Sequence, residues 1–173
     1  MLLKLVGSIF VIFAGSYLGF SIAKRYIKRP NNLRQVLSCI VSLKSYINYT
    51  VMPLSDSLMN CAMGANREVT NFFTTTADLL KNNYLLLPQE AIQRSLILHK
   101  NKLSLTNEDC EVLLLFGSHL GEMDREEQQK YLTMIQKRLE ILEGEATVLR
   151  DKNSKMYRYL GVCGSLMVVL LLL

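Results

Sequence analysis

Two uncharged apolar runs occupy the ends of this chain, and the basic residues beside each run lie on its inner side. The first run covers residues 5–23 and is followed directly by Lys24 and Arg25. The second run covers residues 159–173 and is preceded by Arg158. At about 1.5 Å per helical residue, the first run approaches the roughly 30 Å hydrocarbon thickness of a bilayer. The pattern predicts a hairpin in a membrane, with everything between the two runs on one face.

The hairpin divides the chain into three parts. We predict a transmembrane helix at 1–23, a cytoplasmic helical domain at 24–158, and a short second transmembrane helix at 159–173. The second run has no polar face that could meet water, which favours a span over a buried core helix. Small residues in the first run favour close helix–helix approach in lipid: Gly7, Ala14, Gly15, Ser16 and Gly19.

The orientation follows from the distribution of basic residues. Residues 24–34 carry five Lys or Arg and no acid, and residues 150–158 carry four with one acid. Basic residues concentrate on the cytoplasmic side of membrane spans. The domain is therefore expected in the cytoplasm, with both termini on the opposite side. The alternative is a secreted helical protein whose first run is a cleaved signal peptide, although no small-x-small cleavage site follows that run.

The net charge of +5 resembles that of a nucleic-acid-binding protein, but its distribution does not. Between residues 35 and 149 there are ten Lys or Arg against fourteen Asp or Glu, a net of −4. The basic excess therefore lies beside the two spans, where it can meet anionic membrane lipids. We expect no binding of nucleic acid.

Cysteine and histidine give no metal or redox pattern. The four cysteines show no C-x-x-C spacing, and in a cytoplasmic domain we expect them reduced and buried. The two histidines, His99 and His119, have no partner at metal-ligand spacing. We expect neither a metal nor a cofactor.

The middle of the chain predicts an all-α fold, a bundle of six helices, because glycine is sparse and no alternating strand pattern is sustained. Pro30 predicts a break, with Asn31 and Asn32 as caps of the helix that follows it. Pro53 and Leu54 predict the start of a second helix, because proline is common in a first turn. A third helix is expected over 69–80, and Pro88 predicts the start of a fourth.

The last two helices are expected to be antiparallel neighbours. Thr106 and Asp109 resemble a capping box at the start of the fifth helix, on which Gly117 faces inward. Gly121 is placed to end that helix in a left-handed turn, and Asp124 with Glu127 caps the sixth.

The sixth helix carries a heptad seam, whose positions are spaced alternately three and four residues apart and are apolar except for Asn153 near the membrane end. The seam is either an intermolecular coiled coil or the core face of the bundle, and we favour the core face. Its members are Leu132, Ile135, Leu139, Leu142, Ala146, Leu149, Asn153 and Met156.

No constellation in the sequence predicts an active site. A Gly-rich phosphate loop and a nucleophile elbow are both absent from the sequence. Asp124, Glu126 and Glu127 could be read as paired carboxylates, but acids in a first helical turn ordinarily stabilise the helix dipole. The sequence therefore predicts a protein that is not an enzyme.

Several short segments, taken in order, resemble the stage III sporulation protein AB family of endospore-forming bacteria over nearly the whole chain. They are Met1–Gly7, Gly19-Phe20, Arg29-Pro30, Ile47-Asn48-Tyr49, Pro53-Leu54-Ser55, Phe116-Gly117, Leu120-Gly121, Asp124, Gln128-Gln129-Lys130 and Leu160-Gly161-Val162. The resemblance implies a domain like the six-helix cytoplasmic domain of the inner-membrane platform proteins of type II secretion and type IV pilus systems.

The resemblance also implies a role. The protein would be a platform-like subunit of the sporulation channel, in the mother-cell membrane around the forespore. A secretion-type sporulation ATPase would dock on its domain, and other channel membrane proteins would contact its spans. We expect the ATPase at an exposed acidic turn formed by Glu122, Asp124, Glu126 and Glu127. The alternative is a purely structural anchor for channel proteins, because fold alone does not fix function.

Overall fold

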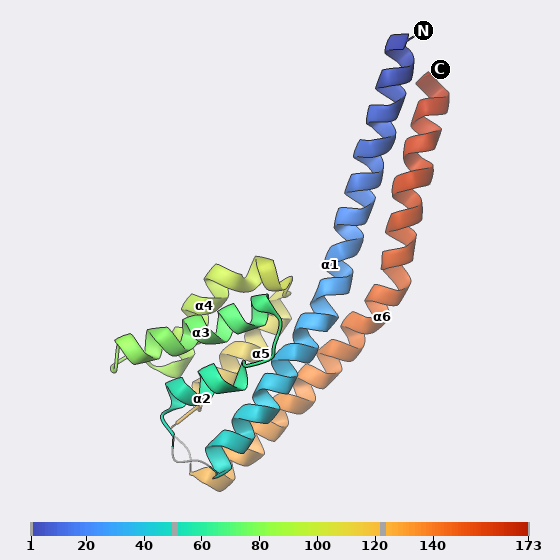
Figure 1. Ribbon diagram of the computed structural model, residues 1–173. Helices are drawn as coiled ribbons and strands as arrows, with labels where there is room; N and C mark the ends of the chain where they lie inside the picture. The colour runs from blue at the N-terminus through green and yellow to red at the C-terminus, as the bar shows by residue number, and fades with distance from the viewer. Residues whose placement is uncertain (1, 50–51, 122–123, 173) are drawn as a thin grey trace. The chain divides into compact units, whose positions relative to one another are not determined.

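The computed structural model describes residues 2–49, 52–121 and 124–172, and over these residues the chain forms six α-helices and no strand (Figure 1). The predicted all-α class with six helices is therefore confirmed. The helices are α1 (Leu2–Tyr49), α2 (Leu54–Cys61), α3 (Arg67–Asn82), α4 (Pro88–Leu103), α5 (Asn107–Ser118) and α6 (Arg125–Leu172).

The chain divides into two compact units. The bundle unit is Asn31–Gly144, and the terminal unit combines Met1–Pro30 with Glu145–Leu173. Helices α2 to α5 lie in the bundle unit together with parts of α1 and α6. The membrane boundaries that the sequence predicts, after residues 23 and 158, stay predictions.

Local capping signals account for most helix starts in the bundle unit. Pro53 precedes α2 and its carbonyl accepts the backbone N–H of Ser57 at 3.0 Å, as expected for a first helical turn. Pro88 occupies the first turn of α4. Asn66 caps α3 by accepting the backbone N–H of Val69 at 3.0 Å. Thr106 and Asp109 form the predicted capping box at the start of α5.

The predicted break at Pro30 is wrong, because α1 continues through this proline. Asn31 and Asn32 therefore do not cap a new helix. Asn32 is instead buried, donates its side-chain amide to the carbonyl oxygen of Leu103 at 2.8 Å, and accepts from the Asn66 side chain at 2.8 Å. A proline inside a helix costs roughly 3 kcal/mol, which burial of the following turns can offset.

The core of the bundle unit is apolar and rich in phenylalanine. Phe72 and Phe73 on α3 contact each other edge to face, with ring centroids 5.1 Å apart. A buried hydrogen bond between Thr76 and Ser95, 2.9 Å long, joins α3 to α4. The largest fully buried side chains are Phe72, Phe73, Phe116, Leu33, Ile40, Leu43, Leu58, Ile92, Leu103, Leu113, Leu120 and Leu132.

The heptad seam on α6 is a core face over most of its length, as favoured from the sequence. Leu132, Ile135, Leu139, Leu142 and Ala146 are all buried. Beyond Ala146 the prediction is wrong, because Leu149 is 41% exposed and Met156 46% exposed.

In the terminal unit, α1 and α6 lie side by side and contact each other through glycine backbones (Figure 1). A Cβ atom added at Gly19 would lie 2.7 Å from the carbonyl oxygen of Tyr157 and 2.9 Å from Cα of Gly161. A Cβ atom added at Gly15 would lie 2.7 Å from Cβ of Ser165. The two backbones can approach this closely because these positions carry no larger side chain.

Aromatic residues surround one end of this helix pair. The rings of Tyr26 and Tyr157 stack with their centroids 5.5 Å apart. The guanidinium of Arg158 lies 5.8 Å from the centroid of the Phe20 ring, within range of a cation–π interaction. The hydrogen bond that the Tyr26 hydroxyl makes with Tyr157, followed by burial, raises the pKa of Tyr26 above its ordinary value of 10.0.

The large apolar side chains of the terminal unit face outward. Phe10 and Phe13 are each 73% exposed on α1, and Leu170 is 76% exposed on α6. Taken over the described residues, no helix of the chain is both long enough and apolar enough to cross a membrane. The two transmembrane helices read from the sequence therefore stay predictions.

Candidate functional site

The predicted acidic turn lies at the start of α6. The carboxylate of Asp124 accepts the backbone N–H of Glu127 at 2.8 Å, and its carbonyl accepts the N–H of Gln128 at 2.9 Å. The predicted cap is thus confirmed. Gly121, at the end of the preceding turn, has φ +86°, a left-handed conformation that favours glycine. Glu122 lies outside the described residues.

Two carboxylates follow the cap on α6. Glu126 and Glu127 are exposed, as a docking surface requires. Glu126 also lines a shallow polar cavity of about 290 Å³, together with Gln129, Lys130, Lys44 and Thr133. The Lys44 ammonium donates to the Thr133 hydroxyl at 2.7 Å. The surface is therefore not purely acidic, and sequence reasoning missed the lysine that α1 brings to it.

The predicted structural positions are placed as follows. Pro53 is exposed and Leu54 half-buried at the start of α2. Gly117 faces inward on α5, where an added Cβ would lie 2.7 Å from Cδ1 of Ile92 and 2.9 Å from Cα of Gln89. Gly117 thus allows α5 to pack closely against the first turns of α4.

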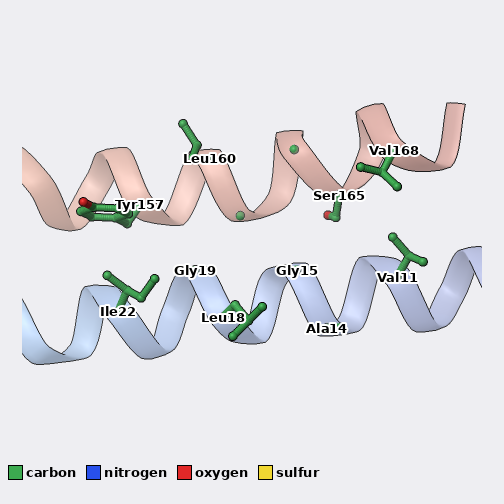
Figure 2. A pocket seen from close by; sticks show the side chains of 12 residues that line it. Val11, Ala14, Gly15, Leu18, Gly19, Ile22, Tyr157, Leu160, Ser165 and Val168 are labelled. Carbon is green, nitrogen blue, oxygen red and sulfur yellow. The ribbon is translucent and has the colours of Figure 1, made fainter. Parts of the chain in front are cut away.

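A groove runs along the helix pair of the terminal unit, and its volume is about 470 Å³ (Figure 2). Its walls are almost entirely apolar and come from both helices, with Ser165 pointing from α6 toward α1. Sequence reasoning noted small residues in the first run but missed their partners in the second. The available signal was the repeated spacing of small residues four apart, Gly15 with Gly19 and Gly161 with Ser165.

The histidines have local partners rather than ligand sets. His99 Nε2 lies 3.0 Å from the Thr75 hydroxyl, and burial followed by the charge of Lys102 lowers the pKa of His99. The ring of His119 lies edge-on to Tyr131, with centroids 4.9 Å apart. Among the described residues, no group of three or more His, Cys, Asp or Glu could hold a metal ion.

The expectation that the cysteines are buried holds for three of them. Cys39, Cys61 and Cys110 are buried free thiols. Cys163 is exposed, so the prediction is wrong there. Its place on the outward face of the terminal unit explains the difference.

Comparisons with known proteins agree with these observations. A family model described as stage III sporulation protein AB matches residues 4–173. The stage III sporulation protein AB of Bacillus subtilis (strain 168) is 34% identical over 172 residues, which cover 99% of this chain and 100% of the relative. A solved structure of a stage III sporulation protein AB matches with a TM-score of 0.67 at 30% identity, covering 72% of this chain and 98% of that chain. The resemblance read from the sequence is confirmed, and the chain belongs to the stage III sporulation protein AB family.

Proposed function

We propose that this chain is a non-enzymatic, platform-like subunit of the sporulation channel between mother cell and forespore. Membership in the stage III sporulation protein AB family supports a role in sporulation. The observation that carries a membrane role is a contrast between the two units. All of the largest fully buried side chains belong to the bundle unit, although that unit also exposes large apolar residues such as Leu85. The terminal unit contributes none of them and exposes side chains such as Phe13 and Leu170. Outward apolar side chains on a helix pair are stable in lipid and costly in water.

In this proposal the terminal helices anchor the chain in the mother-cell membrane. The basic residues beside the two apolar runs meet anionic lipid on the cytoplasmic side, where the bundle unit lies. The test is fractionation of sporulating cells followed by alkaline carbonate extraction. An anchored chain stays with the membrane pellet, and release into the supernatant would contradict the anchor.

The acidic turn is the proposed docking surface for a secretion-type ATPase. Exposed Glu126 and Glu127 follow a helix start that Asp124 holds in place, so they offer fixed negative charges to a basic partner surface. The partner would push on the bundle unit, and other channel membrane proteins would contact the terminal helices.

The docking experiment uses the full chain in mild detergent with the ATPase as prey. The double variant Glu126→Lys with Glu127→Lys reverses two charges and should weaken capture at least tenfold. The matched control is Glu108→Lys with Glu111→Lys, which makes the same charge change at two exposed positions of α5. Equal capture by both double variants would remove the acidic turn from the proposal.

Two alternatives give other results. A purely structural anchor would capture channel membrane proteins but not the ATPase, even as the unaltered chain. A secreted protein with a cleaved leader would give a mature N-terminus beyond residue 20 in Edman sequencing. The contacts of Gly15 and Gly19 with α6 favour a retained first helix, since cleavage would strip α6 of its partner in the terminal unit.

A further inference from the structure

The groove of the terminal unit is held open by small residues. Its walls include Val11, Ala14 and Leu18 from α1 and Leu160, Gly164 and Val168 from α6 (Figure 2). A Cβ atom added at Gly164 would meet no other atom within 4 Å. The glycine contacts at Gly15, Gly19 and Gly161 bring the backbones together, and no side chain then fills the space beside them.

The length and the lining of the groove fit a hydrocarbon chain. On α1 it extends from Val11 to Ile22, about 16 Å at the helical rise of about 1.5 Å per residue. Its walls are almost entirely apolar along that length. A single extended acyl chain can therefore lie along the groove.

One end of the groove is basic and aromatic. Ile22 and Tyr157 line this end, and Arg25 comes seven residues after Leu18, on the same face of α1 as the groove wall. The guanidinium of Arg158 lies over the ring of Phe20, which does not line the groove. Tyrosines and basic side chains suit the headgroup level of a bilayer, and the positive charge of Arg25 at this end favours a negatively charged headgroup.

We propose that this groove binds one acyl chain of an anionic phospholipid, with the phosphate held by Arg25 at the end of the groove that Ile22 and Tyr157 line. The inference rests on the proposed membrane placement of the terminal helices. It adds a defined lipid site to the diffuse attraction between basic flanks and anionic lipid. The bound chain would cover apolar groove walls that the two helices leave open.

The experiment measures lipid retention by the full chain. The protein is reconstituted into vesicles of equal parts phosphatidylglycerol and phosphatidylcholine, extracted in mild detergent, and analysed by native mass spectrometry. We expect the unaltered chain to retain phosphatidylglycerol several-fold over phosphatidylcholine. Gly164→Leu places a side chain in the groove and should lower retention at least fivefold. Arg25→Gln should lower the preference for phosphatidylglycerol, whereas Arg158→Gln, outside the groove, should leave it unchanged.

The control for added bulk is Gly7→Leu. Gly7 is also open, since an added Cβ meets nothing within 4 Å, but it does not line the groove. This variant should retain lipid like the unaltered chain. Ala14→Leu, which fills the groove from α1, replaces Gly164→Leu if circular dichroism shows that the latter is less helical.

Several results would overturn the inference. Equal retention by Gly164→Leu and Gly7→Leu would mean that the groove does not hold the lipid, and so would equal retention of both lipids. Cross-linking of Gly164→Cys to a second copy, in a Cys163→Ser background, would assign the groove to a protein helix instead. A chain recovered in the membrane pellet without retained lipid refutes the lipid site alone. A chain absent from that pellet refutes the proposed anchor as well.

Discussion

The side-chain amide of Asn32 donates to the carbonyl oxygen of Leu103 at 2.8 Å, and both residues are buried. Asn32 also accepts from Asn66, so one amide on α1 fixes the end of α4 and the cap of α3. A buried carbonyl left without a donor costs about 1–3 kcal/mol.

Asn32→Leu should therefore lower the free energy of unfolding of the chain by about 2–3 kcal/mol, because it strands the Leu103 carbonyl and the Asn66 amide. The measurement is urea unfolding followed by circular dichroism. The control is Asn31→Leu at the exposed neighbouring position, which should change stability by less than about 0.5 kcal/mol. Similar losses in both variants would mean that the amide network contributes little.

Gly19→Ala should loosen the helix pair of the terminal unit. The new methyl group would lie 2.7 Å from the Tyr157 carbonyl oxygen, a backbone atom that cannot turn away. Overpacking of this kind costs about 1–3 kcal/mol. Hydrogen–deuterium exchange should speed up over residues 10–22 and 157–168, whereas Gly7→Ala should leave it unchanged or slower. Unaltered exchange in Gly19→Ala would argue against this close contact.

Replacing glycine by alanine should change the stability of the chain in opposite directions at two further positions. Gly117→Ala should destabilise the chain by about 1–2 kcal/mol, because the added Cβ meets Ile92 and the backbone of Gln89. Gly144→Ala should stabilise it by about 0.5–1 kcal/mol, because it lies inside α6 with open space beside it. Thermal unfolding of the two variants tests the pair, and shifts of the same sign would contradict it.

The lowered pKa of His99 predicts that the stability of the chain depends on pH. Burial and Lys102 lower its pKa in the folded chain below the ordinary 6.5. Below pH 6.5 the unfolded chain binds the proton of His99 more readily than the folded chain does. The contribution of neutral His99 to the free energy of unfolding is therefore fully present above about pH 6.5 and is lost as the pH falls through the folded-state pKa.

Unfolding of His99→Gln and the unaltered chain should be compared between pH 7.5 and pH 5, an interval chosen about the ordinary histidine pKa near 6.5. The variant should lose less stability as the pH falls. His119→Gln is the control and should follow the unaltered chain. Parallel curves for all three proteins would refute the role of His99.

The helix starts could be predicted because their signals are local. The capping bonds of Thr106 with Asp109 and of Asp124 with Glu127 join residues three apart in the sequence. Such bonds depend on residue type and spacing alone. The fold class followed for the same reason, since each helix carries its own start and its own apolar stripe.

The break expected at Pro30 failed because its outcome depends on distant residues. Asn32 forms its bonds with Leu103 and Asn66, which are 71 and 34 residues away. A single sequence gives no sign that these partners meet. Asparagine after proline normally indicates a cap, and here tertiary packing overrides that preference.

The candidate surfaces also differ in whether their residues are close together or far apart in the sequence. The acidic turn could be predicted because its residues are continuous in the sequence. Lys44 could not, because its partner Thr133 follows it by 89 residues in the sequence. The groove was missed because its two walls come from opposite ends of the chain. The spacing of small residues in each run indicated a contact but not the empty space beside it.

Because Cys163 is exposed and the other three cysteines are buried, the number of reactive thiols shows whether the chain is folded. Cys39, Cys61 and Cys110 are buried, and hydrogen bonding to Cys39 followed by burial raises the pKa of Cys61. The thiolate is the form that attacks a maleimide, and burial keeps the reagent away from all three thiols, including Cys39, whose pKa the hydrogen bond with Cys61 lowers. Cys163 lies in the proposed second span, so a small maleimide that enters the detergent micelle should label the folded chain once and the unfolded chain four times. The mass of the labelled protein then counts intact molecules in any preparation without a single mutation.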